Sequence, residues 1–113
     1  MAVTTRETDQ ALVLEVSGKI TIGRGDIEIR EAIDEALASG YRSIVLDLGQ
    51  VKTIDSAGTG ELVAAHRLVA KNGGRLVLTQ LSPKVDGVLT ATCLIGVLEI
   101  YPTLSTALLE LAA

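Results

Sequence analysis

An adjacent aspartate and serine, Asp55 and Ser56, stand out as side chains that could do chemistry. They lie in the stretch TIDSAGTG, residues 53–60, which separates two apolar segments. Three roles suit the serine: a nucleophile, a phosphate acceptor or a helix cap. The surrounding residues discriminate among these roles.

A nucleophilic role for Ser56 is poorly supported by its neighbours. A nucleophile elbow has the pattern Gly-x-Ser-x-Gly, but Ile54 stands two positions before the serine. The one histidine, His66, comes ten residues later, which is roughly 15 Å along a helix and beyond hydrogen-bond reach. One histidine and one cysteine predict no transition-metal site, and no phosphate-loop or dinucleotide motif is present. We therefore expect no catalytic residues, no metal and no cofactor, and a protein that is not an enzyme.

The helix-cap interpretation agrees with the residues that follow. Asp or Ser before a helical run satisfies N–H groups that have no partner inside the helix. Capping does not account for Gly58 and Gly60 in the first turns, because each glycine costs about 1 kcal/mol relative to alanine. We interpret these glycines as bare backbone that something approaches closely.

The elements that position this stretch follow from the apolar pattern and the turn residues. The predicted strands cover residues 3–8, 11–16, 43–48, 75–79 and 98–101. The predicted helices cover residues 26–39, 57–72, 83–92 and 104–112. A glycine-punctuated loop is predicted over residues 18–25.

This order of elements predicts an α/β fold. The first two strands form an antiparallel hairpin, and the later alternation of strands and helices places the other strands parallel. The result is a mixed, mostly parallel sheet of about five strands covered by about four helices. Functional sites in such sheets favour the carboxyl ends of strands, and TIDSAGTG lies at such a place.

The predicted helix after Ser56 has two different faces. An apolar stripe that should pack on the sheet carries Leu62, Ala65, Leu68 and Val69. The opposite face, termed the outward stripe, carries Ser56, Gly60, Val63 and Arg67, with Thr59 and Ala70 beside them. The outward stripe is either a shallow docking surface for another protein or an ordinary solvated face, and the spacing alone leaves both open.

Composition excludes several kinds of partner. The 113 residues suit one domain, predicted to span residues 1–113, with an aliphatic core because only 2% of residues are aromatic. A net charge of −4 and few aromatic side chains argue against nucleic acid. The sequence has no apolar run of the roughly 18 residues that suggest a membrane span, and no signal peptide. We expect a cytoplasmic protein without a membrane partner, in which Cys93 is a buried apolar residue.

The run IVLDLGQVKTIDSAGTGELVAAHRLVAKNGGRLVL, residues 44–78, resembles the STAS domain, specifically the bacterial anti-sigma factor antagonists. Their signature is an apolar strand ending in Asp-Leu, a short turn, and Asp-Ser-Ser/Thr/Ala-Gly opening a glycine-bearing helix. A Gly-Gly-x-Leu turn follows, here at residues 73–76, and LSPKV at residues 81–85 resembles the start of the family's third helix. The resemblance spans essentially the whole chain.

The resemblance implies a STAS fold and a phosphorylation switch. In that family, an anti-sigma factor that is also a kinase phosphorylates the serine after the aspartate, here Ser56. The unphosphorylated antagonist binds the anti-sigma factor and frees the sigma factor; phosphorylation ends that binding, and a serine phosphatase restores it. Together, the resemblance and the outward stripe predict the partner-binding residues Thr21, Asp55, Ser56, Ala57, Gly58, Thr59, Gly60, Val63 and Arg67.

One departure from the family pattern concerns the loop after the second strand. Antagonists commonly have an aspartate there, and Thr21 takes its place in this chain. That loop belongs to the usual partner surface, so the identity of the kinase is left open. The alternatives are a non-phosphorylated STAS scaffold subunit of a stress-sensing or lipid-transport assembly, and a small-molecule site in the loop over residues 18–25. The apolar content of the outward stripe also leaves room for weak homodimerisation.

Overall fold

A five-stranded sheet forms the centre of the computed structural model, which describes residues 2–112. The strands are β1 Ala2–Glu7, β2 Leu12–Ile20, β3 Ser43–Ile54, β4 Arg75–Thr79 and β5 Ile100–Tyr101. The helices are α1 Gly25–Ala38, α2 Ser56–Lys71, α3 Pro83–Ala91 and α4 Leu104–Ala112. The strands lie in the order β1-β2-β3-β4-β5, with β1 antiparallel to β2 and the other pairs parallel. The predicted mixed sheet with four helices is confirmed.

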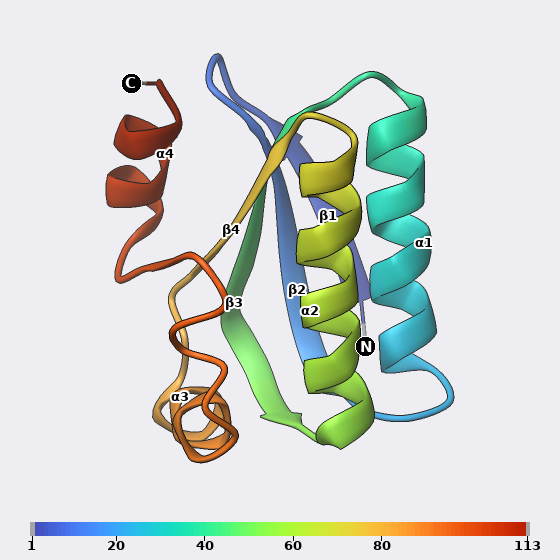
Figure 1. The fold of residues 1–113 in the computed structure, drawn as a ribbon, viewed down its shortest axis with the longest axis vertical. Coiled ribbons are helices and arrows are strands. Elements are labelled where there is room, and N and C mark those ends of the chain that lie inside the picture. The colour runs from blue at the N-terminus through green and yellow to red at the C-terminus, as the bar shows by residue number, and fades with distance from the viewer. Residues whose placement is uncertain (1, 113) are drawn as a thin grey trace.

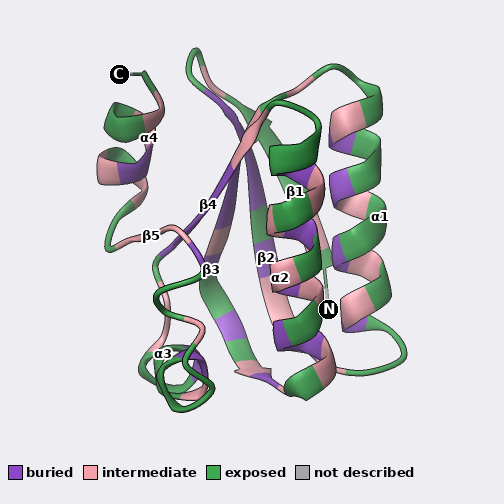
Figure 2. Cartoon of the chain, viewed as in Figure 1, coloured by how far each residue is buried: buried purple, intermediate pink, exposed green. Residues whose placement is uncertain are grey.

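Helices cover both faces of the sheet, but unequally. α1 and α2 lie side by side on one face, and α4 lies on the other (Figure 1). The sides of α1 and α2 that point to the strands are buried, whereas their outer sides are exposed (Figure 2). α3 packs beside the carboxyl-terminal part of β3. Within residues 2–112, none of the helices combines the length and the apolar character that crossing a membrane requires.

Alternation along the central strand builds two apolar cores, because successive side chains of a strand point to opposite faces. Ile44 and Leu46 of β3 are fully buried in the larger core under α1 and α2. Val45 lies in the smaller core with Val77 of β4 and Ala107 of α4. The strongly apolar strand β3 is therefore covered on both faces, as its sequence predicts.

Two strands extend further than predicted. β2 continues to Ile20 and β3 to Ile54, and the two ends pair in parallel, so the loop predicted over residues 18–25 begins only at Thr21. Register shifts near Ser17 and Gly18 interrupt the simple alternation that the sequence pattern relies on. The predicted end of the third strand at residue 48 is therefore six residues too early.

The segment between α3 and β5 also differs from the prediction. Cys93 is exposed, and its φ of 61° places it in the left-handed region at a chain reversal after α3. It is not the buried residue that its apolar neighbours suggested. Leu98 is buried but belongs to a turn, in which its N–H donates to the carbonyl of Leu94 at 3.0 Å. β5 is consequently shorter than the predicted strand over residues 98–101.

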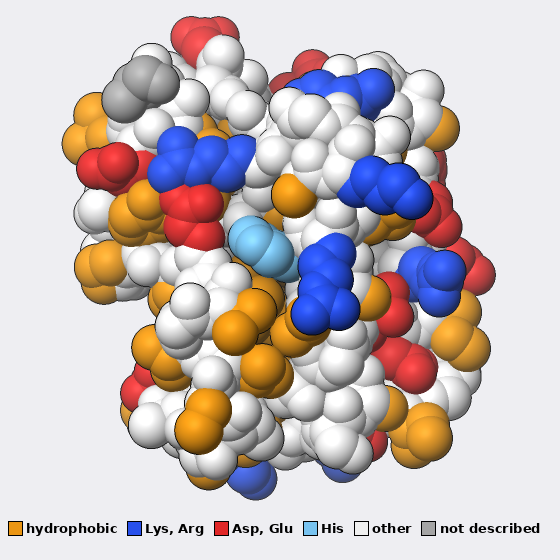
Figure 3. Space-filling model, viewed as in Figure 1, with side chains coloured by type: hydrophobic (Ala, Val, Ile, Leu, Met, Phe, Trp, Pro, Cys, Tyr) orange, Lys and Arg blue, Asp and Glu red, His pale blue; other side chains and the backbone are white. Residues whose placement is uncertain are grey.

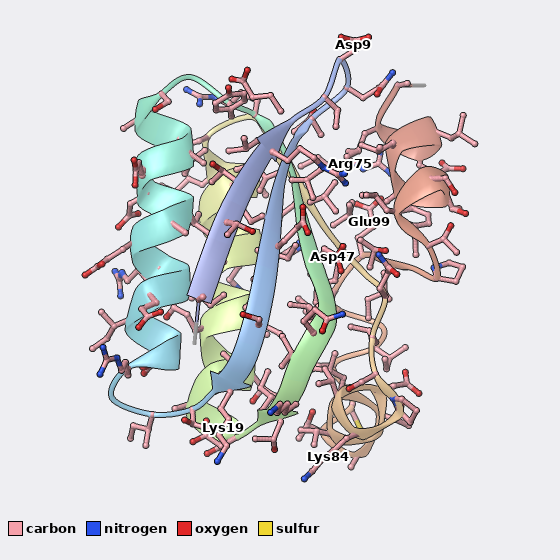
Figure 4. The ribbon with its side chains drawn as sticks, turned by 180° about the vertical axis from the view of Figure 1, so that it is seen from behind. Asp9, Lys19, Asp47, Arg75, Lys84 and Glu99 are labelled. Atoms are coloured by element: carbon pink, nitrogen blue, oxygen red, sulfur yellow. The ribbon has the colours of Figure 1, made fainter. Side chains whose placement is uncertain are left out.

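An ion pair ties this last segment to β4. Arg75 and Glu99 point toward each other beside α4, on the face seen from behind in Figure 4. The Tyr101 hydroxyl donates to the same carboxylate at 2.7 Å. The hydrogen bonds from Arg75 are the largest of the effects that hold the pKa of Glu99 below its usual value. Farther along the same sheet face, Asp47 accepts from the Gln80 side chain at 3.0 Å.

Candidate functional site

The stretch TIDSAGTG lies where the carboxyl ends of β2 and β3 meet. β3 ends at Ile54 and α2 begins at Ser56, so a single residue, Asp55, connects them. Ile20, the last residue of β2, is in register with Ile54. The β2–α1 loop, residues 21–24, and the first turn of α2 therefore lie at the same edge of the sheet (Figure 1). Open α/β sheets place their functional sites at such edges.

Asp55 holds two segments of this edge together. One carboxylate oxygen, Oδ1, accepts a hydrogen bond from the N–H of Gly58 at 2.8 Å and so caps α2. The other, Oδ2, accepts from the N–H of Ile22 in the β2–α1 loop at 3.0 Å. These bonds, first the one from Gly58 and then the one from Ile22, lower the pKa of Asp55. The aspartate therefore stays ionised and links the loop to the helix.

Ser56 is the first residue of α2 and is exposed. The side-chain cap is provided by Asp55, and within residues 2–112 the hydroxyl of Ser56 makes no hydrogen bond. Ser56 lies at the positive end of the dipole of this 16-residue helix, and the first turn of α2 contains no acidic residue. This arrangement leaves the hydroxyl accessible and suits a phosphate group at that position.

The surroundings of Ser56 do not suit catalysis. His66 lies on the same helix, ten residues further on, so it cannot serve as a general base for the serine. Among the residues that the structure describes, no three His, Cys, Asp or Glu side chains come together as a metal site. What distinguishes this edge is an exposed serine hydroxyl at the start of a helix.

Gly58 is approached closely by the chain itself. A Cβ atom on Gly58 would stand 2.1 Å from the carbonyl oxygen of Ile20 and 2.8 Å from Cγ1 of Ile54. The predicted close approach is real at this glycine, but β2 makes it and not a partner. Thr59 is also buried, and its hydroxyl donates to the carbonyl of Ser56 at 2.9 Å. The predicted place of Thr59 on the outward side is therefore wrong, because its side chain is buried and its hydroxyl is used within the helix.

Three of the four residues that define the outward stripe face solvent, as predicted. Ser56, Gly60 and Arg67 are exposed, and a Cβ atom on Gly60 would meet nothing within 4 Å. Val63, the fourth, is only half-exposed because it packs against the larger core. Ala57 is also half-buried, but not against that core. The sheet-facing stripe is confirmed, with Leu68 half-buried and the other three residues buried: Leu62, Ala65 and Val69.

A family model described as the STAS domain matches residues 2–107. The chain belongs to the STAS domain family. The resemblance that residues 44–78 carry is thereby confirmed, and so is the STAS fold.

Several proteins similar to this STAS domain are named as anti-sigma factor antagonists. A Thermotoga maritima protein named as an anti-sigma factor antagonist is 31% identical over 102 residues, which cover 90% of each chain. The crystal structure of a Thermotoga maritima protein so named superimposes with a TM-score of 0.89 at 29% identity, covering 98% of this chain and 95% of the other. The structure of an anti-sigma factor antagonist from Mycobacterium paratuberculosis gives a TM-score of 0.86 at 25% identity, covering 99% and 94%.

One residue of this STAS domain that the sequence interpretation missed is Ile22. Its side chain is 76% exposed in the β2–α1 loop, next to the left-handed turn at Gly23, where φ is 92°. Asp55 holds it near Ser56 through the backbone bond described above. Thr21, which takes the place of the usual family aspartate, is half-buried, and its carbonyl accepts from the N–H of Asp26 at 3.3 Å. An isoleucine among the glycines of a polar loop is the signal that could have identified this position.

The Asp55→Asn variant tests the link between loop and helix. The asparagine keeps one acceptor for Gly58, but its NH2 group then faces the N–H of Ile22 and cannot accept from it. We expect amide hydrogen exchange at Ile22 to become at least about tenfold faster, as expected when a hydrogen bond worth about 1.5 kcal/mol or more is lost. The exchange at Gly58 should change little.

In the wild type, lowering the pH should weaken the same link between Asp55 and the N–H of Ile22, because it protonates the carboxylate. Because the folded-state pKa of Asp55 is lowered, its stabilising effect is present above its usual pKa of 3.8 and is lost as the pH falls through the lower folded value. The control is Asp47→Asn, which removes a carboxylate from the face of the sheet on which α4 lies, away from the β2–α1 loop. Unchanged Ile22 exchange in Asp55→Asn, or equal acceleration in the control, would contradict the link.

Proposed function

We propose that this protein is an anti-sigma factor antagonist controlled by phosphorylation of Ser56. In this proposal the unphosphorylated form binds an anti-sigma factor that is also a serine kinase, and a sigma factor is released. A serine phosphatase reverses the modification. The protein is the substrate of both enzymes and is not itself a catalyst, and it acts in the cytoplasm as one domain over residues 1–113.

The observation that carries the proposal is the exposed Ser56 hydroxyl at the first position of α2. Capping does not occupy this hydroxyl, because Asp55 makes the cap. A phosphoserine adds roughly −1.5 to −2 charges, which exposed N–H groups and the dipole of α2 stabilise. The domain can therefore carry the phosphate without unfolding.

Phosphorylation is expected to end partner binding because it adds negative charge to Ser56, next to Asp55. The phosphate would stand beside the ionised Asp55, so the local field would become strongly negative. Burying these charges under a partner costs desolvation energy and repels any acidic group across the interface. An on/off change in affinity then requires no large rearrangement of this chain. The proposed partner surface comprises the predicted binding residues. Gly58 and Thr59 are buried, so they support this surface and do not contact the partner directly.

The test of the proposal is phosphate transfer to Ser56. The protein would be incubated with ATP and the serine-kinase anti-sigma factors encoded in the same genome, and phosphate would be located by mass spectrometry. We expect one phosphate, on Ser56. If no kinase of this kind labels Ser56, the non-phosphorylated scaffold is the better reading.

The Ile22→Ser variant tests whether the β2–α1 loop contributes an apolar anchor to partner binding. Burying an isoleucine side chain is worth about 1.5–3 kcal/mol, so its removal should weaken binding to the anti-sigma factor by about 10- to 100-fold. Isothermal titration calorimetry measures the effect. The matched control is Leu109→Ser, because Leu109 is 73% exposed on α4, on the other face of the sheet. Equal affinities of the two variants would rule out a special role for Ile22.

A further inference from the structure

A groove lies between the exposed sides of α1 and α2, with a volume of about 340 Å³. Its apolar lining consists of Ile33, Ala64, Ala65 and Leu68. Two successive alanines on α2 leave the hollow, since their side chains are too short to fill the space beside α1. The groove is thus a shallow apolar trough that neither helix fills.

Three cations border this groove: Arg30 of α1, and Arg67 and Lys71 of α2. All three side chains belong to exposed residues. Within residues 2–112, the ion pairs involve other cations: Arg6 with Glu15, Arg24 with Glu28, and Arg75 with Glu99. Figure 3 shows blue side chains over α2 and along its border with α1. The cations at the groove are therefore available to a ligand.

One carboxylate, Glu61, also lines the groove. Its partial burial raises its pKa, and the charge of Arg30 opposes that shift. Asp26 and Asp34 of α1 are close enough to raise the pKa of Glu61 as well. Among the residues that line the groove, three are cations and one is a carboxylate, in a chain whose net charge is −4. The lining of the groove therefore carries a net positive charge, and two carboxylates of α1 stand near it.

We propose that this groove binds a short acidic segment that carries an apolar side chain, contributed by the anti-sigma factor that docks at Ser56. The inference rests on the proposed function. An apolar side chain of the segment would pack on the apolar lining of the groove, and its carboxylates would pair with the cations. A guanidinium group can bind a carboxylate through two parallel hydrogen bonds. Arg67 belongs to the outward stripe, eleven residues and roughly 16 Å from Ser56 along α2. A partner that covers the stripe therefore reaches the groove.

A short segment fits this site better than a long polyanion does. Other carboxylates stand near the groove, since Asp26 and Asp34 of α1 both act on Glu61 in its lining. A nucleic acid strand that extends beyond the three cations would meet these carboxylates, which costs repulsion. A groove with three cations in its lining matches a ligand that carries few negative charges.

Charge reversal tests the proposal on the complex. The double variant Arg30→Glu, Arg67→Glu should bind the anti-sigma factor at least about tenfold more weakly than wild type, with the difference shrinking as salt is added. The control is Arg6→Glu, Lys84→Glu, which changes the net charge equally but lies on the first strand and on α3. We expect the control to bind within about twofold of wild type. Equal affinities of the two double variants would overturn the proposal, whereas a wild type that binds no anti-sigma factor would instead refute the proposed function.

A titration that needs no anti-sigma factor tests the groove by itself. A hexapeptide of alternating glutamate and leucine would be added to isotope-labelled protein, and amide chemical shifts would be followed by NMR. We expect shifts at Ala64, Arg67 and Leu68 that are absent from the Arg30→Glu, Arg67→Glu variant. A lysine–leucine hexapeptide should cause none. Absence of shifts with the acidic peptide, or equal shifts with a short single-stranded DNA, would overturn the proposal.

Discussion

Replacing Gly58 with alanine is expected to lower the free energy of unfolding by about 3 kcal/mol, although alanine is the better helix former. The new methyl group would stand 2.1 Å from the carbonyl oxygen of Ile20, which is backbone and cannot turn aside. It would also crowd Cγ1 of Ile54 at 2.8 Å. β2 and the start of α2 would have to separate, so the loss exceeds the helix-propensity gain of about 1 kcal/mol. Urea unfolding followed by circular dichroism measures this change.

The matched control for this prediction is Gly60→Ala, two residues along the same helix. Gly60 is exposed, and a Cβ atom there would meet nothing within 4 Å. We expect this variant to be more stable than wild type by about 0.5–1 kcal/mol, because alanine loses less backbone entropy than glycine in a helix. The two variants should therefore change stability in opposite directions. A Gly58→Ala protein as stable as wild type would contradict the packing described for this helix start.

Replacing Ser56 with aspartate is expected to weaken binding to the anti-sigma factor by about 100-fold, which is about 2.7 kcal/mol. The added charge stands beside Asp55 on the proposed docking surface, where it must be desolvated and meets the partner. Folding should not suffer, since a carboxylate in the first turn of α2 interacts favourably with the helix dipole. Thermal unfolding and calorimetric binding would be measured on the same sample.

Two further variants separate charge at the docking surface from charge in general. Ser56→Ala should bind like the unphosphorylated wild type and accept no phosphate. Ser105→Asp adds the same charge in the first turn of α4, at an exposed residue on the other face of the sheet, and should bind normally. If Ser56→Ala and Ser56→Asp bind equally well, phosphorylation at this residue does not control binding.

Local chemistry made several elements predictable from the sequence. The strand over residues 75–79 has the predicted bounds, because Gly73-Gly74 ends one helix and an apolar run follows. Ser82 caps α3 by accepting from the N–H of Val85 at 3.3 Å. Thr103 likewise accepts from the N–H of Thr106 at 3.1 Å at the start of α4. Such features depend on residues within three or four positions of one another, so a linear pattern contains them.

The candidate site was found from the sequence for the same reason, because Asp55-Ser56 stands between a strand and a helix. Which of the two caps α2 was left open, and the geometry assigns the cap to Asp55 and frees the hydroxyl of Ser56. The outward stripe was predicted by helical spacing, but the spacing misplaced Thr59. Periodicity describes a helix by itself and contains no information on which of its residues other segments of the chain cover.

Only the tertiary structure decided the features that join distant segments. The bond from Ile22 to Asp55 spans 33 residues, and the close approach of Ile20 to Gly58 spans 38. The groove between α1 and α2 likewise brings Arg30 to the same side as Arg67 and Lys71. Sequence alone determined the family, the order of the elements and the candidate serine, since these depend on local residue types. The packing of β2 against the start of α2 determined which residues surround that serine, because contacts between distant segments exist only in the folded chain.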